Sequence, residues 1–122
     1  MSATLTLDHV TLAWSSLEPL ERALVEVGLR ADYGGPHGNR ATHMDVLGFD
    51  DGSYVELIAP FEPGAPMAWE VHLRGDAGPS AWAVTLSGTP ELAAEAERMR
   101  ARGVTVRGPM PSSRMRPDGQ HA

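Results

Sequence analysis

The chain has 122 residues, of which 42% are hydrophobic and 21% are charged, and it contains no cysteine. Its length suits one domain with its own core, and the lack of cysteine excludes disulfides, thiolate chemistry and cysteine-based zinc sites. A net charge of −6 without a long basic run argues against nucleic-acid binding, which needs a positive patch facing the phosphates. The sequence also lacks an apolar run of membrane-spanning length and an N-terminal signal peptide, so we expect a cytoplasmic protein that does not bind membranes.

The first half of the chain begins with a strand pattern followed by a helix pattern. Apolar and polar residues alternate over residues 5–14, which predicts a strand. A helix is expected between Ser16, a good N-cap residue, and Gly28, which suits the position just after a helix end. A short strand near 29–33 and a glycine-rich loop at 34–39 should follow.

Two more strands are expected at 42–49 and 53–59, on either side of an Asp-Gly dipeptide at 51–52. This dipeptide is typical of a two-residue hairpin turn, which would place Glu56 opposite Leu47. One face of the hairpin would then be largely polar and line a cavity, and it would consist of His43, Asp45, Leu47, Tyr54, Glu56 and Ile58. The other face would be apolar and would consist of Met44, Val46, Val55, Leu57 and Ala59. A slip of one residue would exchange these faces.

The second half of the chain repeats the order of the first. After a proline-rich connection and a short helix near 67–73, a strand is expected at 82–86. A second helix should begin at Thr89 and stop at Gly103, before a strand at 104–106. The tripeptide Val-Thr-Leu occurs in the opening strand of each half, and a glycine ends each helix at nearly the same spacing. This order predicts a duplicated module.

Three segments carry a resemblance to a known family. Residues 7–10 (Leu-Asp-His-Val) resemble the opening strand of vicinal-oxygen-chelate domains, and residues 54–60 resemble the end of their first module. Between them, residues 37–42 resemble a loop of glyoxalase-like members, the group that includes glyoxalases, bleomycin-resistance proteins and extradiol dioxygenases. The resemblance implies an α+β fold in which two tandem βαβββ modules form a curved mixed sheet around a cavity.

The resemblance also implies a single glyoxalase-like domain over residues 1–122. Module one would span about residues 4–62 and module two about residues 79–122. The second module would be truncated, because the turn-like segment at 114–119 is followed by three residues. Such a sheet leaves an open edge, so we expect a second copy of the chain to cover it in a homodimer. The alternative is that the chain is a fragment or a shortened gene product.

Metal-dependent members of this family hold one divalent ion between the first and last strands of each module. By position, the resemblance makes His9 and Glu56 the metal ligands, with Glu56 as the catalytic residue. An imidazole with carboxylates suits Zn, Mn, Fe, Co or Ni. The counterpart of His9 in module two is Ala83, which cannot bind a metal. His9 and Glu56 could instead be structural, with Glu56 paired to a cation such as Arg40.

Other polar residues near these positions are candidates for substrate contact. They are His37, Arg40, His43, Asp45 and Tyr54. Their alternative role is that of ordinary solvated loop or strand residues.

Three functional hypotheses follow. The first is a metal-dependent lyase, isomerase or dioxygenase that acts on a small oxygenated metabolite. The second is a metal-free protein that binds or sequesters a small molecule, and the third is a catalytically inactive assembly module. The sequence favours the glyoxalase-like enzyme class by resemblance and does not identify the metabolite.

Overall fold

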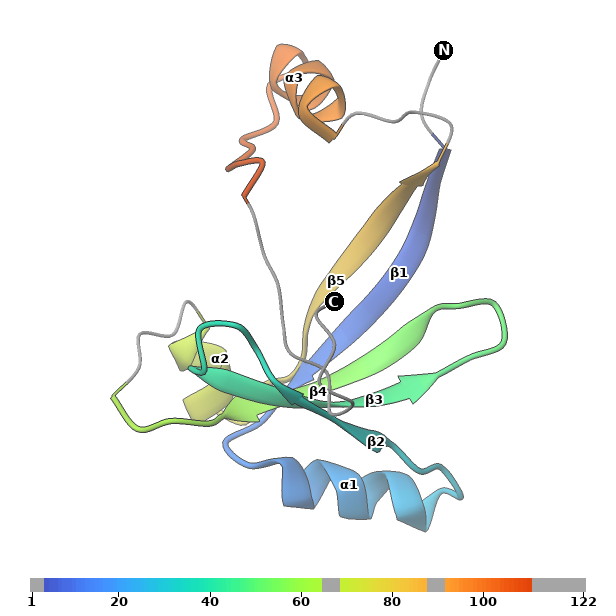
Figure 1. The fold of residues 1–122 in the computed structure, drawn as a ribbon, viewed down its shortest axis with the longest axis vertical. Helices are drawn as coiled ribbons and strands as arrows, with labels where there is room; N and C mark the ends of the chain where they lie inside the picture. The colour runs from blue at the N-terminus through green and yellow to red at the C-terminus, as the bar shows by residue number, and fades with distance from the viewer. Residues whose placement is uncertain (1–3, 65–68, 88–91, 111–122) are drawn as a thin grey trace.

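The computed structural model describes residues 4–64, 69–87 and 92–110, which form one five-stranded sheet and three helices (Figure 1). In chain order the elements are β1 (Thr4–Ala13), α1 (Leu17–Glu26), β2 (Asp32–Pro36), β3 (Thr42–Gly48), β4 (Tyr54–Pro60), α2 (Glu70–Arg74), β5 (Gly78–Ser87) and α3 (Leu92–Ala101). The predicted α+β fold with a curved mixed sheet is therefore confirmed. No helix in this part of the chain has the length and hydrophobicity that crossing a bilayer requires.

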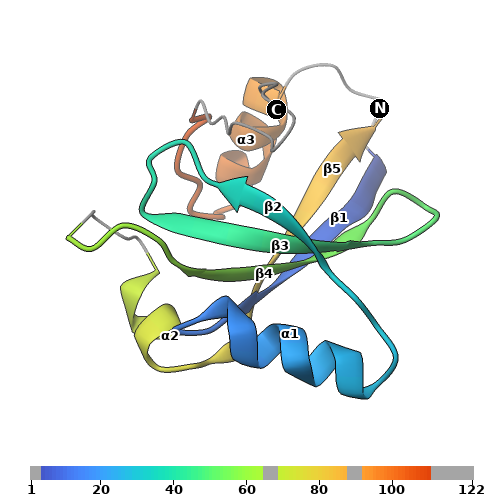
Figure 2. The same ribbon diagram turned by 60° about the horizontal axis from the view of Figure 1, so that its bottom comes forward.

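The strands lie in the order β2-β3-β4-β1-β5. β1 is parallel to β4 and antiparallel to β5, and the other neighbours are antiparallel. The two strands that are predicted to open the two modules, β1 and β5, are therefore neighbours. Figure 2 shows α1 running beneath the sheet, and Figure 1 shows α3 beyond the tip of β5.

Two hydrophobic clusters hold α1 and α2 to opposite faces of the sheet. The larger cluster contains Leu17 of α1 with Leu57 and Ala59 of β4. The smaller cluster joins Leu73 of α2 to Ile58, which points to the other face of β4 because side chains alternate along a strand. The α1 face of the sheet therefore carries most of the core.

The helix ends agree with the sequence prediction. Ser16 occupies the N-cap position of α1, and Gly28 follows the end of the helix with a φ of 81°. Beyond it, the N–H of Leu29 donates to the carbonyl of Leu24 at 2.9 Å. Gly103 follows α3 with a φ of 86°. Both glycines adopt the left-handed conformation that other residues rarely occupy.

Other predicted boundaries are wrong or lie outside the described residues. β2 continues into the predicted loop at 34–39, because a glycine at 34 lets β3 approach closely. A Cβ at Gly34 would lie 3.1 Å from the side chain of Met44. Residues 104–106 form no strand, since no described strand pairs with them. Thr89, the predicted N-cap of the second helix, lies outside the described residues.

The β3–β4 hairpin has a different turn from the predicted one. The N–H of Phe49 donates to the carbonyl of Ser53 at 2.9 Å, so three residues, Asp50–Gly52, form the loop. Gly52 has a φ of 88°, as expected where a three-residue loop ends in a left-handed residue. Asp51 accepts hydrogen bonds from the N–H and hydroxyl of Ser53, at 2.9 and 2.6 Å. The extra loop residue shifts the strand register by one.

This register corrects the predicted faces of the hairpin. Glu56 pairs with Val46 and not with Leu47. His43 and Asp45 therefore lie on the α1 face of the sheet, and Glu56 lies on the opposite face. The prediction that these three polar side chains share one face is wrong.

Asp45 is 1% exposed and lies on the sheet face that α1 covers. Its strand neighbours are Leu57 and Tyr33, and no described residue is hydrogen-bonded to its Oδ2 atom. Burial, together with hydrogen bonding and charge repulsion from Glu21 of α1 and repulsion from Asp32, raises the pKa of Asp45 to about 7. Asp45 is thus a buried carboxyl group that takes up a proton near neutral pH.

Replacement of Leu57 by Ala should lower the free energy of unfolding by about 2–5 kcal/mol, because it opens a cavity in the α1 cluster. Leu57 is 0% exposed. Val25→Ala, at a position of α1 that is 63% exposed, is the matched control and should change stability by about 0.5 kcal/mol or less. Urea unfolding of both variants measures the difference. Equal losses in the two variants would contradict the assigned core.

Asp45→Asn should flatten the pH dependence of stability. Because folding raises the pKa of Asp45 from 3.8 to about 7, its contribution is fully present below 3.8 and is lost as pH rises toward 7. The free energy of unfolding of the variant minus that of the wild type should therefore be larger at about pH 8 than at about pH 5. Urea midpoints at both pH values test this, with the exposed Asp50→Asn as control. The wild-type comparison is needed because burial lowers the pKa of the nearby His43, which acts in the opposite direction. A constant difference between Asp45→Asn and wild type would refute the assignment.

Candidate functional site

The parallel pairing of β1 with β4 brings the main candidate residues together. His9 pairs with Tyr54 and Thr11 pairs with Glu56, so all four side chains lie on the sheet face opposite α1. The structure thus places His9 and Glu56 on the same side, as the sequence analysis expects. Their roles in metal binding and catalysis stay predictions.

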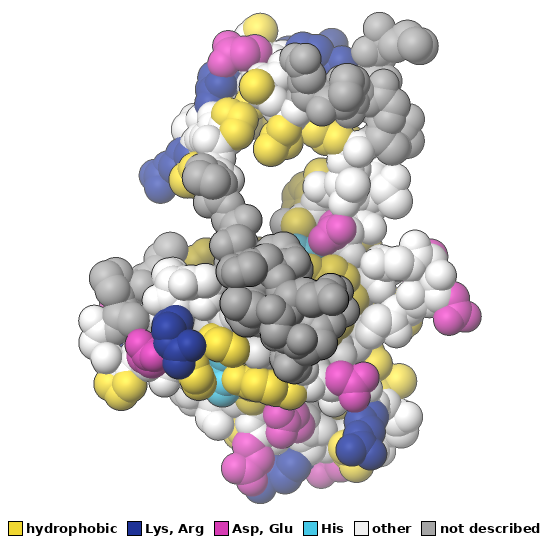
Figure 3. Space-filling model, in the orientation of Figure 1, with side chains coloured by type: hydrophobic (Ala, Val, Ile, Leu, Met, Phe, Trp, Pro, Cys, Tyr) yellow, Lys and Arg dark blue, Asp and Glu magenta, His cyan; other side chains and the backbone are white. Residues whose placement is uncertain are grey.

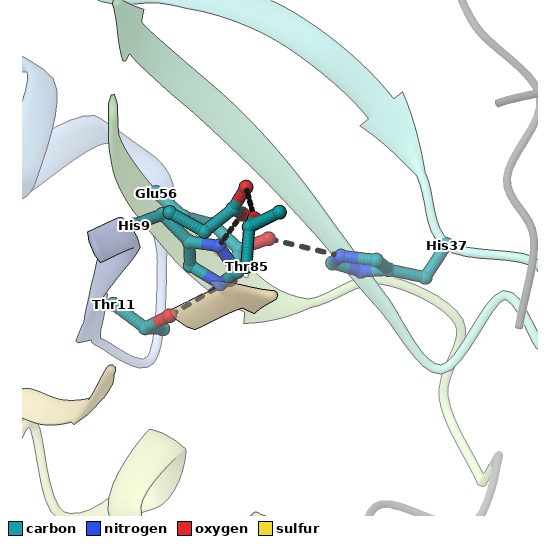
Figure 4. Close-up of polar contacts among 6 residues, drawn as sticks. His9, Thr11, His37, Glu56 and Thr85 are labelled. Carbon is teal, nitrogen blue, oxygen red and sulfur yellow. Dashed lines mark hydrogen bonds and ion pairs between the residues drawn. The ribbon is translucent and has the colours of Figure 1, made fainter. Parts of the chain in front are cut away.

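Glu56 is the buried centre of this group, with 8% of its surface exposed. Its Oε1 atom accepts a hydrogen bond of 3.0 Å from the hydroxyl of Thr11. Its Oε2 atom lies 3.3 Å from Nε2 of His37. Figure 4 shows His37 reaching Glu56 from one side while Thr11 and His9 lie on the other. Both carboxylate oxygens therefore have polar partners within the protein.

These partners keep the Glu56 carboxyl group ionised. Burial by itself would raise its pKa. The hydrogen bond and charge of His37, the hydrogen bond from Thr11 and the charge of His9 outweigh burial, so the pKa of Glu56 lies below its usual value. The site therefore presents a buried negative charge to anything that binds beside it.

His37 joins the site from the loop after β2. Its N–H donates to the carbonyl of Thr42 at 2.9 Å, and its ring Nδ1 lies 2.7 Å from the hydroxyl of Thr42. With Nδ1 held by Thr42, the opposite ring nitrogen faces Glu56. The partner of Glu56 in the described structure is thus His37 and not Arg40.

Arg40 points to other partners. Its guanidinium group forms an ion pair with Glu62 and lies 5.0 Å from the ring centroid of Phe61. His43 stacks on the same Phe61 ring at 4.9 Å, and its Nδ1 lies 3.0 Å from the hydroxyl of Tyr33. The structure therefore does not bring Arg40 or His43 to Glu56. Neither does it bring Asp45 there, because that residue faces α1.

Sequence reasoning assigned no role in the site to three residues of this face: Asp8, Thr11 and Thr85. In a regular strand Asp8 would point to the face opposite His9, because the two residues are consecutive. The carboxylate of Asp8 nevertheless lies 2.7 Å from Nδ1 of His9 and accepts a 2.8 Å hydrogen bond from Thr85. Strand alternation does place Thr11 on the face of His9, since it follows His9 by two residues, but it does not predict the hydrogen bond to Glu56.

A metal ion would need more ligands than the described residues group together. Within residues 4–64, 69–87 and 92–110, no cluster of three or more His, Asp or Glu side chains could hold a metal ion. Catalytic divalent sites commonly use about three protein ligands. The strand position opposite His9 on β5 is Ala83, which offers no ligand. The described side chains therefore do not make a complete metal site.

Comparisons with solved structures support the fold. A hypothetical protein from Staphylococcus aureus matches with a TM-score of 0.75 at 16% identity, over 97% of this chain and 50% of that chain. A hypothetical protein from Bacillus halodurans matches with a TM-score of 0.66 at 18% identity, over 97% and 81%. The chain thus spans about half the length of the Staphylococcus aureus protein.

A third similar structure has a named activity. It is a variant of Streptomyces coelicolor methylmalonyl-CoA epimerase in complex with 2-nitronate-propionyl-CoA, with a TM-score of 0.61 at 23% identity. The match covers 91% of this chain and 85% of the epimerase. The epimerase is a member of the vicinal-oxygen-chelate superfamily. At this identity the likeness concerns the fold.

Family comparison covers nearly the whole sequence. A search of curated protein sequences gives no match. The model of the glyoxalase-like domain family matches residues 7–122. The chain therefore belongs to the glyoxalase-like domain family, within the vicinal-oxygen-chelate superfamily.

Proposed function

We propose that the chain binds a small oxygenated metabolite on the sheet face that carries His9, Thr11 and Glu56. The observation that carries this proposal is the ionised carboxylate of Glu56, which is buried on the face away from the main core. Burial of a charge is costly, and a strand that served packing alone would place an apolar residue there. The imidazole of His9 lies on the same face.

The two groups suit a ligand that carries hydroxyl or carbonyl oxygens. A carboxylate accepts hydrogen bonds from hydroxyl groups, and an imidazole nitrogen can donate to or accept from an oxygen atom. The similar epimerase holds a nitronate analogue of an acyl-CoA. Small 2-oxo acids, 2-hydroxy acids and short acyl thioesters are therefore the ligand classes to test first.

A divalent metal at His9 and Glu56 is the second candidate. It is favoured by the Asp8 carboxylate behind His9, since metal-bound imidazoles commonly donate their other ring N–H to a carboxylate. When bound, Zn, Mn, Fe, Co or Ni would supply a Lewis acid for a substrate oxygen. Ala83 leaves the ligand set incomplete, so the metal would need a further ligand from outside the described cluster.

Thermal-shift measurements on native protein test both candidates. We expect a ligand of the classes above, at about 100 times its Kd, to stabilise the wild type by about 2.7 kcal/mol, which raises its melting temperature by about 10 °C. Glu56→Gln and His9→Ala should lose most of that rise, whereas the exposed His72→Ala should retain it. Parallel titrations with each metal, with and without chelator, report metal binding separately.

The outcomes separate the hypotheses. An equal rise in wild type and Glu56→Gln for every ligand would overturn the proposed site. Binding that persists in chelator supports the metal-free binding protein. Turnover of a bound ligand by the wild type and not by Glu56→Gln would support a lyase, isomerase or dioxygenase role with Glu56 as the catalytic residue. A cytoplasmic location stays a prediction.

The expected homodimer is also part of the proposal. Among the described strands, β5 is at the edge of the sheet, and the segment 78–87 contains no charged residue that would discourage strand pairing. Trp82 and Val84 on this strand are 70% and 37% exposed. Figure 3 shows further hydrophobic side chains on the side of α3 that faces β1 and β5. An apolar, uncharged edge favours pairing with a second copy.

Light scattering at micromolar concentration tests the dimer. The wild type should have twice the mass of the chain, and Val84→Lys should shift it toward the monomer, because a charge at an edge opposes pairing. Val71→Lys of α2, at a position that is 83% exposed and lies outside the sheet, serves as the control. A monomeric wild type would contradict the dimer and leave the metabolite site unaffected.

A further inference from the structure

The orientation of His9 is set by a residue that a regular strand would point away from it. On β1, Leu7 pairs with Val84 and His9 pairs with Ala83, the next residue of β5. One extra residue, Asp8, therefore lies between two consecutive pairs and forms a β-bulge. Because adjacent residues of β5 point to opposite faces, Leu7 and His9 do so as well.

The bulge brings the Asp8 carboxylate to the His9 side of the sheet. Oδ2 of Asp8 lies 2.7 Å from Nδ1 of His9, a short distance for a hydrogen bond between a ring N–H and a carboxylate. The hydrogen bond with His9 and, next in size, one from Thr85 lower the pKa of Asp8 from its usual value. Asp8 is therefore an ionised acceptor, and the hydrogen of this contact belongs to Nδ1.

Thr85 holds Asp8 from the neighbouring strand. Its hydroxyl donates to Oδ1 of Asp8 at 2.8 Å, which leaves Oδ2 for His9. The two residues are far apart in sequence, so this contact links the first strand of predicted module two to the imidazole of His9 in module one. β5 thus supports His9 through Thr85, although the β5 residue that pairs with His9 is Ala83.

A second contact fixes the plane of the imidazole. The ring of Tyr54, the β4 partner of His9, stacks on it at 4.7 Å with an angle of 17° between the planes. The Asp8 hydrogen bond fixes one ring edge and Tyr54 fixes one ring face. No described residue is hydrogen-bonded to Nε2, the nitrogen at the far edge of the ring.

We infer that Asp8 and Thr85 are positioning residues that hold His9 as the Nδ1–H tautomer and reserve the Nε2 lone pair for a ligand. This inference rests on the proposed function of the same face and deepens it, because it names the atom of His9 that accepts a hydrogen bond from a metabolite hydroxyl group, takes up a proton or binds a metal ion. The tautomer is set by the partner of the other ring nitrogen, which here is a carboxylate.

Nitrogen NMR of the ligand-free, metal-free protein tests the inference. Long-range ¹H–¹⁵N correlation spectra distinguish a protonated ring nitrogen from one with a lone pair, and the signals lost in His9→Gln identify His9. At about pH 9, where an ordinary imidazole is neutral, Nδ1 of His9 should carry the proton and Nε2 should not. Nε2 protonation in the wild type would overturn the inference.

Variants separate positioning from folding. Asp8→Ala should move the proton of His9 largely to Nε2, whereas Asp8→Asn, which keeps an accepting oxygen, should retain much of the Nδ1–H form. Thr85→Val should give a mixture, and Thr85→Ser should restore the wild-type spectrum. Thr6→Val, at the position that pairs with Thr85, is the matched control and should leave the His9 signals unchanged.

These outcomes are independent of the metabolite test. An unchanged tautomer in folded Asp8→Ala and Thr85→Val would refute the positioning role even if a ligand binds. If the wild type shows the expected tautomer but ligands and metals raise the melting temperatures of the wild type and His9→Ala equally, the proposed function is refuted and the positioning role stands. If Asp8→Ala does not fold, Thr85→Val alone decides, because it removes one hydrogen bond at nearly constant volume.

Discussion

The register between β1 and β4 is the constraint on which the candidate site depends. It places Thr11 beside Glu56 and His9 beside Tyr54 on the face away from α1. A carboxylate at this depth is stable because Thr11 and His37 each hold one of its oxygens. If the register of β4 shifted by one residue, Glu56 would point to the α1 face, among the apolar side chains of the cluster that contains Leu57. None of the described residues in that cluster could hydrogen-bond a carboxylate with its side chain.

The sequence predicts the parts of this structure that depend on local signals. Alternation identifies β1, and the glycines at 28 and 103 mark where α1 and α3 end. The motif resemblance predicts the glyoxalase-like fold, which the family comparison supports. The placement of His9 and Glu56 on one face follows from alternation along two strands that lie side by side, so it could also be predicted.

The remainder depends on single-residue irregularities in the backbone. Asp-Gly at 51–52 fits both a two-residue turn and the end of a three-residue loop, and the structure forms the latter. That difference moves His43 and Asp45 to the opposite face. The bulge at Asp8 likewise leaves no periodic signal, because it is visible through its partners on β5. Each irregularity changes which polar side chains can meet.

The two buried carboxyl groups of the sheet show why the faces differ in chemistry. Glu56 is 8% exposed and Asp45 is 1% exposed, so burial opposes ionisation of both. Glu56 has an imidazole and a hydroxyl as partners, and its pKa falls; Asp45 has the acidic neighbours Glu21 and Asp32, and its pKa rises. The Glu56 face therefore keeps a fixed charge for an incoming ligand, whereas the α1 face takes up a proton and links stability to pH. Only the former lies beside His9, whose imidazole is held in place by groups from three strands.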